Sequence, residues 1–220
     1  MRNAPVIVVL AAGRGSRYAA QGHKLAQPLG ELSVLGQTVT HAISSGLPVV
    51  VVTTERLAAE SARWVARRDV VVLPEADGTD SALGMGYSIA TGVAARPDAS
   101  GWLVLPGDMP LMQPQHLASL VAEHETSGAA VTILTAHLAD PSGYARVVRG
   151  KADKIVQVVE EVEADDAGRA ITEVSAGVYC FRRSLLAPAL RRINPRNTRG
   201  VYYLSDIVRV LADTGHPVAA

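Results

Sequence analysis

Residues 6–24 read VIVVLAAGRGSRYAAQGHK, and this stretch decides the fold. Its apolar, β-branched start predicts a buried strand, and the run Gly13-Arg14-Gly15-Ser16-Arg17 predicts a loop, with Lys24 beyond it. Glycines let backbone N–H groups approach an anion closely, and arginine and lysine balance the charge of a phosphate chain. The stretch therefore predicts a strand that leads into a phosphate-binding loop, and it indicates nucleotide chemistry.

Short apolar runs alternate with helical patterns through the first half of the chain. Such alternation predicts right-handed crossover units and hence an α/β fold, a Rossmann-like, mostly parallel central sheet flanked by helices. The expected strands are 5–11, 48–53, 70–73 and 102–105, and the expected helices are 34–45, 55–67, 85–95 and one that begins near Pro114. The run PGDMP over 106–110 then places Asp108 at a strand's carboxyl end, where open α/β sheets bind ligands.

Beyond Gly128 the pattern changes, because the predicted strands now follow one another directly. They are 130–136, 145–148, 154–160 and 173–181, and helices are expected at 184–192 and 202–214. This order is typical of antiparallel or mixed sheet growth. We therefore expect one domain over residues 1–220, with a small β-rich extension over 129–220, and we expect the acidic run 160–166 to be a solvated loop.

The composition excludes several classes of protein. The chain has 220 residues, of which 48% are hydrophobic, and its 21 basic and 21 acidic residues give a formal net charge of zero. A zero balance argues against a nucleic-acid partner, and the single Cys180 can form neither a disulfide framework nor a thiolate metal site. The first apolar run is far shorter than the roughly 20 residues of a membrane span. We expect a soluble, cytoplasmic protein with no membrane partner.

The glycine loop departs from two common phosphate-binding motifs. A dinucleotide fingerprint needs a third glycine where this chain has Tyr18, and a P-loop needs serine or threonine where Leu25 follows Lys24. What remains is LAAGxGxR over residues 10–17, followed by Lys24. The plain alternative, in which the loop only turns the chain and Asp108 only caps a strand, stays open on these residues alone.

Together, the motif LAAGRGSR over 10–17, Lys24 and Gly107-Asp108-Met109-Pro110 resemble the nucleotidyltransferases that join a nucleoside monophosphate to a phosphorylated acceptor and release pyrophosphate. The first half is similar to the molybdenum-cofactor nucleotidyltransferases, in residues 84–89 and 105–110. The second half is similar to the sugar-nucleotide pyrophosphorylases, especially the uridylyltransferase that acts on N-acetylglucosamine 1-phosphate. The matching segments there are 140–146, 155–160, 173–177 and 200–207. The resemblance leaves the acceptor open between a sugar 1-phosphate and a molybdopterin.

The chemistry of such a transfer agrees with the residues present. A phosphate monoester is largely dianionic near neutral pH, so no serine, cysteine or histidine is needed to activate it. Cations and positioning must lower the barrier between two anions, and Mg²⁺ on a carboxylate with lysine and arginine is the simplest arrangement. The expected substrates are an NTP (CTP, UTP or GTP) and the phosphorylated acceptor, and Mg²⁺ is the expected cofactor.

The resemblance implies a role for each matching residue. Lys24 would bridge the α-phosphate and the acceptor phosphate, Arg17 would neutralise the leaving pyrophosphate, and Asp108 would hold Mg²⁺. The expected nucleotide-binding residues are Leu10, Ala11, Ala12, Gly13, Arg14, Gly15, Gly84 and Gly107. The expected acceptor-binding residues are Ala145, Glu160 and Ser175 in the 129–220 extension, and His23 is the one histidine expected near a ligand.

Three departures from the family pattern bear on these roles. Ala145 stands where the uridylyltransferases have glycine, and Ser175 stands where they have asparagine, which changes the hydrogen bonds available to an acceptor. The second metal ligand of that family lies beyond the last residue, so Mg²⁺ is expected to rest on Asp108, phosphates and water. A catalytically silent, nucleotide-binding relative is therefore the alternative to an active transferase.

Overall fold

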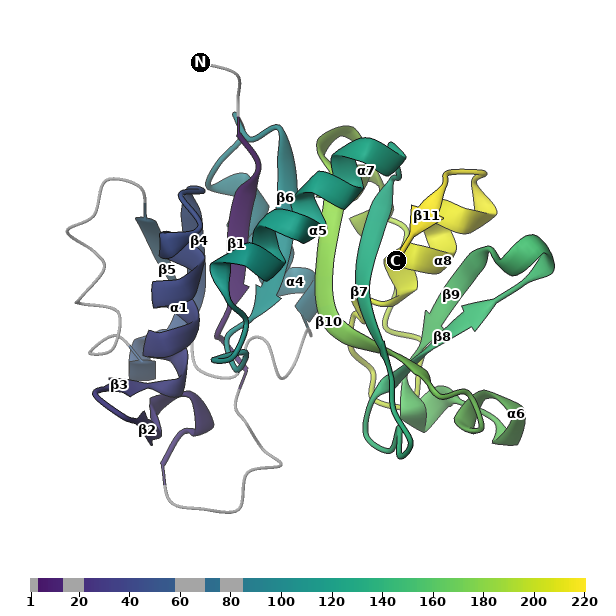
Figure 1. The fold of residues 1–220 in the computed structure, drawn as a ribbon, viewed down its shortest axis with the longest axis horizontal. Helices are drawn as coiled ribbons and strands as arrows, with labels where there is room; N and C mark the ends of the chain where they lie inside the picture. Colours follow the sequence, from purple (N-terminus) through teal and green to yellow (C-terminus); the bar gives the residue numbers. More distant parts are fainter. Residues whose placement is uncertain (1–3, 14–21, 58–69, 76–84) are drawn as a thin grey trace.

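The computed structural model describes residues 4–13, 22–57, 70–75 and 85–220. Its main sheet has the strand order β11-β7-β10-β6-β1-β4-β5, with β8 paired to β10 and β9 paired to β8 (Figure 1). The strands are β1 Val6–Leu10, β4 Val49–Thr54, β5 Val70–Glu75, β6 Gly101–Pro106, β7 Val131–His137, β8 Ala145–Arg149, β9 Ile155–Val159, β10 Glu173–Arg182 and β11 Val218–Ala219. The predicted α/β fold with a mixed, mostly parallel central sheet is confirmed.

The first half of the chain builds a parallel sheet that is covered on both faces. β1 pairs in parallel with β4 and β6, and β4 with β5. Because both faces are buried, β1 and β4 read as continuous apolar runs rather than as alternating ones. One face packs on α1 Val34–Ser44 and α5 Pro114–Ser127, and the opposite face packs on α4 Met85–Ala94, α7 Arg183–Leu190 and α8 Asp206–Asp213.

The second half extends the same sheet with antiparallel strands. β10 runs antiparallel to β6 and β7, and its first residues also pair with β8, which pairs with β9. An irregularity between Ser175 and Tyr179 bends β10, and Gly177 within it has a φ of 77°, a conformation that side chains rarely adopt. The β8–β9 hairpin therefore stands beside the bent part of β10, on the side of the molecule away from β5 (Figure 1).

Several expectations on the elements need correction. The last helix begins at Asp206 rather than near Tyr202, because the Tyr202 carbonyl accepts from the Gly86 N–H of α4 at 3.2 Å and does not start a helical turn. The acidic run 160–166 is not only a loop, since it contains the 3₁₀ helix η4 Glu161–Glu163 and the first residue of α6 Asp166–Arg169. The expected helix 55–67 lies mostly outside the described residues, and 55–57 form a 3₁₀ turn.

Two short pairings were absent from the sequence-based prediction. β11 joins β7 in parallel at the end of the sheet, and the hairpin β2 Pro28–Leu29 with β3 Leu32–Ser33 forms a separate ribbon. Cys180 is a buried strand residue as expected, and burial raises the pKa of its thiol to about 12. None of the helices that the structure describes has the length and apolar character that a membrane crossing requires.

Candidate active site

The carboxyl ends of β1 and β6 meet at one edge of the sheet. Leu10 and Pro106 are register partners, and the Gly107 N–H donates to the Leu10 carbonyl at 2.8 Å. A Cβ on Gly107 would lie 2.9 Å from that carbonyl oxygen, so only glycine permits this approach. The turn after β6 therefore brings Asp108 beside the segment that follows β1, as expected for adjacent parallel strands.

Lys24 and Asp108 meet at this edge although 84 residues separate them in the chain. The Lys24 Nζ lies 2.5 Å from Asp108 Oδ2, and the two side chains are 39% and 38% exposed. Because an exposed ion pair adds only about 0–1 kcal/mol to stability, the pair matters for where it places its charges rather than for folding. Because solvent reaches both groups, the Lys24 ammonium is able to bind a phosphate and the Asp108 carboxylate is able to bind a divalent cation.

His23 connects Lys24 to the end of β1. Its Nδ1 accepts from the Leu25 N–H at 3.2 Å, so its Nε2 is the protonated nitrogen and donates to the Gly13 carbonyl at 2.8 Å. The ring is buried, and it caps the 3₁₀ helix η1 Lys24–Ala26 that carries the lysine. His23 thus lies near the site as expected, and its observed contacts support Lys24 and Gly13.

The structure describes only some of the residues that are expected to bind the nucleotide. Leu10, Ala11 and Ala12 are buried at the end of β1, and the Ala11 N–H donates to the Val52 carbonyl at 2.7 Å. The Leu10 carbonyl and the Ala11 N–H are therefore used within the sheet, which leaves later backbone groups for a ligand. Arg14, Gly15, Arg17 and Gly84 lie outside the described residues, and their roles stay predictions.

The three expected acceptor residues lie in β8, in β10 and directly after β9. Ala145 and Ser175 are register partners across β8 and β10, and Glu160 follows the last residue of β9. The Glu160 Oε1 accepts from the Ser205 hydroxyl at 2.8 Å, which adds a residue that we did not single out from the sequence. The signal for Ser205 was present, because it lies in the similar segment 200–207.

The Ser175 hydroxyl is directed into the protein. It lies 2.9 Å from the Tyr179 hydroxyl and accepts from the Gly177 N–H at 3.1 Å, and Ser175 is only 5% exposed. Burial raises the pKa of Tyr179, so this phenol stays protonated. The side chain that replaces the family's asparagine is therefore engaged in holding the bend of β10.

The bent strand β10, which carries the expected acceptor residue Ser175, contacts the strand that precedes Asp108. A Cβ on Gly177 would lie 3.3 Å from the Pro106 Cγ, so the bend of β10 packs directly on the end of β6. Tyr179, two residues further, pairs with Val104 of β6. The Lys24–Asp108 pair and the expected acceptor residues are thus linked through the last residues of one buried strand.

Asp108 is the carboxylate that the structure describes at the position where the metal is expected. In the parts of the chain that the structure describes, no group of three or more histidine, cysteine, aspartate or glutamate side chains is placed to hold a metal ion. Mg²⁺ commonly keeps several waters and is held by one or two carboxylates with substrate phosphates. Asp108, with hard oxygen atoms that solvent reaches, fits such a partial coordination shell.

The fold and this arrangement of strand ends define the class, a nucleotidyltransferase domain. The model of the MobA-like NTP transferase domain matches residues 7–210, and the chain belongs to this family. The chain is 37% identical over 214 residues to the bifunctional protein GlmU of Pelotomaculum thermopropionicum, covering 97% of this chain and 46% of that protein. The resemblance to nucleotidyltransferases that the motifs indicated is confirmed.

Other curated relatives of the same name also align with nearly the whole chain. The bifunctional protein GlmU of Geobacter sulfurreducens is 34% identical over 221 residues, which cover 96% of this chain and 45% of that protein. The protein of the same name from Mycobacterium leprae is 36% identical over 229 residues, which cover 100% of this chain and 45% of that protein. The chain thus spans a little less than half the length of the curated relatives it matches.

Proposed function

We propose that this protein is a Mg²⁺-dependent nucleotidyltransferase that transfers a nucleoside monophosphate from an NTP to a sugar 1-phosphate and releases pyrophosphate. The observation that carries the proposal is the contact of 2.5 Å between Lys24 Nζ and Asp108 Oδ2, at the shared end of β1 and β6. Residues 1–128 would bind the nucleotide and residues 129–220 the acceptor. The alternative is a silent, nucleotide-binding relative.

In the proposed reaction an oxygen of the acceptor phosphate attacks the α-phosphorus of the NTP. The bond from that phosphorus to the β-phosphate bridging oxygen breaks, and pyrophosphate leaves with the electron pair. Lys24 would lie between the two anions and reduce their repulsion, while the backbone near Gly13 would orient the phosphate chain. Mg²⁺ held by Asp108 would neutralise charge on the phosphates.

A sugar 1-phosphate is the acceptor favoured over a molybdopterin. The GlmU relatives align with 96–100% of this chain, so most of residues 129–220 lies within each alignment. The Ser205 hydroxyl also orients the Glu160 carboxylate, and a carboxylate oxygen suits the hydroxyl groups of a sugar. UTP is the first nucleotide to test, followed by CTP and GTP. The molybdopterin acceptor and the cytoplasmic location stay predictions.

The test is pyrophosphate release from each NTP with Mg²⁺ and N-acetylglucosamine 1-phosphate, other sugar 1-phosphates or molybdopterin. We expect turnover with a sugar 1-phosphate, and its loss in Lys24→Ala and Asp108→Asn. The matched control is Asp98→Asn, which breaks the exposed Arg96–Asp98 ion pair and should leave the rate unchanged. NTP-dependent thermal stabilisation with no turnover on any acceptor would contradict the proposal and favour the silent relative.

A further inference from the structure

One carboxylate joins the loop before Ala145 to the residue after β9. Glu161 directly follows Glu160, and its Oε2 accepts from the Gly143 N–H while its Oε1 lies 3.6 Å from the Arg146 guanidinium. Gly143 and Arg146 flank the expected acceptor residue Ala145. Glu161, the residue after Glu160, thus contacts the residues on either side of Ala145, in addition to the β8–β9 ladder in which Arg146 pairs with Val159.

The contact between Glu161 and Arg146 depends on the Glu161 charge, because the Arg146 guanidinium is buried. Its side chain is only 2% exposed, and it donates to the Tyr144 carbonyl, while its buried Nε makes no hydrogen bond. A buried guanidinium requires a compensating charge, because transfer of an isolated ion out of water is strongly unfavourable. Without the Glu161 carboxylate, Arg146 would have to move toward solvent and carry the Tyr144 backbone with it.

The pairing of β8 with β10 beside the loop is short, and the bonds from the Tyr144 N–H to the Pro141 carbonyl and from the Ser142 N–H to Asp140 stay within the loop itself. The register contains two pairs, Val174 with Arg146 and Ser175 with Ala145. Ala145 itself is the last residue of this pairing, and Gly143 has a φ of 87° in the turn that precedes it. The position of residues 143–145 is therefore expected to depend on the side-chain contacts of Glu161.

We propose that Glu161 is a positioning residue for the acceptor, which holds the 143–145 loop against Glu160 through the Gly143 N–H and the Arg146 guanidinium. The proposal rests on the proposed transfer to a sugar 1-phosphate. Glu161 does not need to touch the acceptor. Its removal displaces the residues on either side of the sugar and weakens acceptor binding, while the Lys24–Asp108 edge and NTP binding stay intact.

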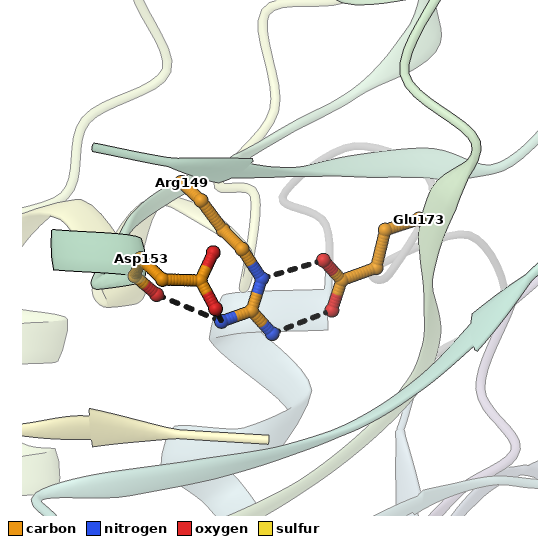
Figure 2. Close-up of polar contacts among 3 residues, drawn as sticks. All are labelled: Arg149, Asp153 and Glu173. Carbon is orange, nitrogen blue, oxygen red and sulfur yellow. Dashed lines mark hydrogen bonds and ion pairs between the residues drawn. The ribbon is translucent and has the colours of Figure 1, made fainter. Parts of the chain in front are cut away.

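The same strand carries a second ion pair that serves as a matched comparison. At the far end of β8, Arg149 forms two parallel hydrogen bonds to Glu173, with Nε to Oε2 at 2.7 Å and Nη2 to Oε1 at 2.8 Å (Figure 2). Arg149 also donates to the Asp153 carbonyl at 2.9 Å in the hairpin turn. This pair joins β8 to β10, and in the described part of the chain the hydrogen bonds of the Arg149 guanidinium go to Glu173 and Asp153 rather than to residues 143–145.

The kinetic test compares Glu161→Gln with Glu173→Gln, using UTP and N-acetylglucosamine 1-phosphate well below the melting temperature of both variants. For Glu161→Gln we expect the acceptor KM to rise on the order of 10-fold, with the UTP KM within about twofold of wild type. For Glu173→Gln we expect a measurable fall in melting temperature with an acceptor KM within about twofold of wild type. Equal acceptor KM values in the two variants, or an unchanged KM in Glu161→Gln, would overturn the positioning role.

A second readout needs no activity. The Glu161→Ala variant removes the acceptor of the Gly143 N–H, so amide hydrogen exchange over residues 140–146 should become faster than in wild type or Glu173→Gln. Unchanged exchange there would overturn the proposed contact. If wild type transfers nothing to any sugar 1-phosphate, the proposed function fails, and the exchange comparison still decides whether Glu161 holds the loop.

Discussion

The two halves of the sheet build their parts of the site in different ways. In the first half, parallel strands β1 and β6 end at the same edge, so Lys24 and Asp108 meet through topology and stay accessible to solvent. In the second half, antiparallel strands and a bend place Ala145 beside Ser175, and two partly buried ion pairs lie on the same strands. We therefore expect substitutions of Lys24 or Asp108 to change activity with little change in stability. In residues 129–220 we expect substitutions at the ion pairs to change stability as well.

The largest effect on activity is expected for the Lys24–Asp108 pair, because solvent reaches both charged side chains. Asp108→Asn and Lys24→Ala should each lower kcat/KM by roughly 10³-fold, because each removes a charge placed at the phosphates. Their free energies of unfolding should fall by at most about 1 kcal/mol, since both side chains are about two-fifths exposed. Initial rates measure kcat/KM, and urea denaturation measures the free energy of unfolding. A large loss of stability in either variant would contradict the expectation that this pair serves activity rather than folding.

A smaller loss is expected from Gly107→Ala. The new Cβ would lie 2.9 Å from the Leu10 carbonyl oxygen, so the turn that carries Asp108 must shift. We expect kcat/KM to fall roughly 10²-fold, as for other displacements on the order of 1 Å. Gly168→Ala is the control, because its Cβ would meet the Asp165 side chain at 3.1 Å in α6, where no site residue is expected. Similar rates for the two variants would contradict the role of Gly107.

In the acceptor half, Glu173→Gln should act on stability. The carboxylate is only 8% exposed and forms two hydrogen bonds with Arg149, whose side chain is 32% exposed (Figure 2). Because Arg149 is partly solvated, we expect a loss of about 2 kcal/mol, below that of a fully buried pair. Chemical denaturation measures it, and a loss no larger than that of Asp98→Asn would show that the pair contributes little.

The same pair predicts a pH dependence. The hydrogen bonds from Arg149 hold the pKa of the Glu173 carboxyl below the usual glutamate value of 4.5. A depressed folded-state pKa contributes stability that is fully present above about pH 4.5 and is lost as pH falls through the folded-state pKa. The difference in unfolding free energy between wild type and Glu173→Gln should therefore shrink below pH 4.5, and a constant difference down to pH 3 would contradict this cause.

The smallest effect is expected from Ser175→Ala. The variant leaves the buried Tyr179 hydroxyl without its partner at 2.9 Å, so the free energy of unfolding should fall by about 1 kcal/mol. If the Ser175 hydroxyl holds the bend and does not bind the acceptor, the acceptor KM should stay within about twofold of wild type. A large rise in KM with little loss of stability would instead assign Ser175 to the acceptor, as the family resemblance implies.

More of the candidate site could be predicted from the sequence in residues 1–128 than in residues 129–220. Lys24 and Asp108 were both identifiable, because each belongs to a short motif and a parallel sheet gathers strand ends at one edge. Glu161 and Ser205 were not identified, since their importance depends on contacts with Gly143 and Glu160. The direction of the Ser175 hydroxyl was equally hidden, because it follows from a bend that three residues of β10 create.

The sequence by itself determined the class of fold and the kind of chemistry. Apolar runs of the length of β1 and β4 specify buried parallel strands, and a glycine-rich cationic loop predicts an anion site, since both are local properties of neighbouring residues. Only the tertiary structure decided which carboxylates are paired, where β10 bends and which side chain contacts Gly143 and Arg146. These depend on register and on charges that lie far apart in the chain, and a linear pattern does not carry that information.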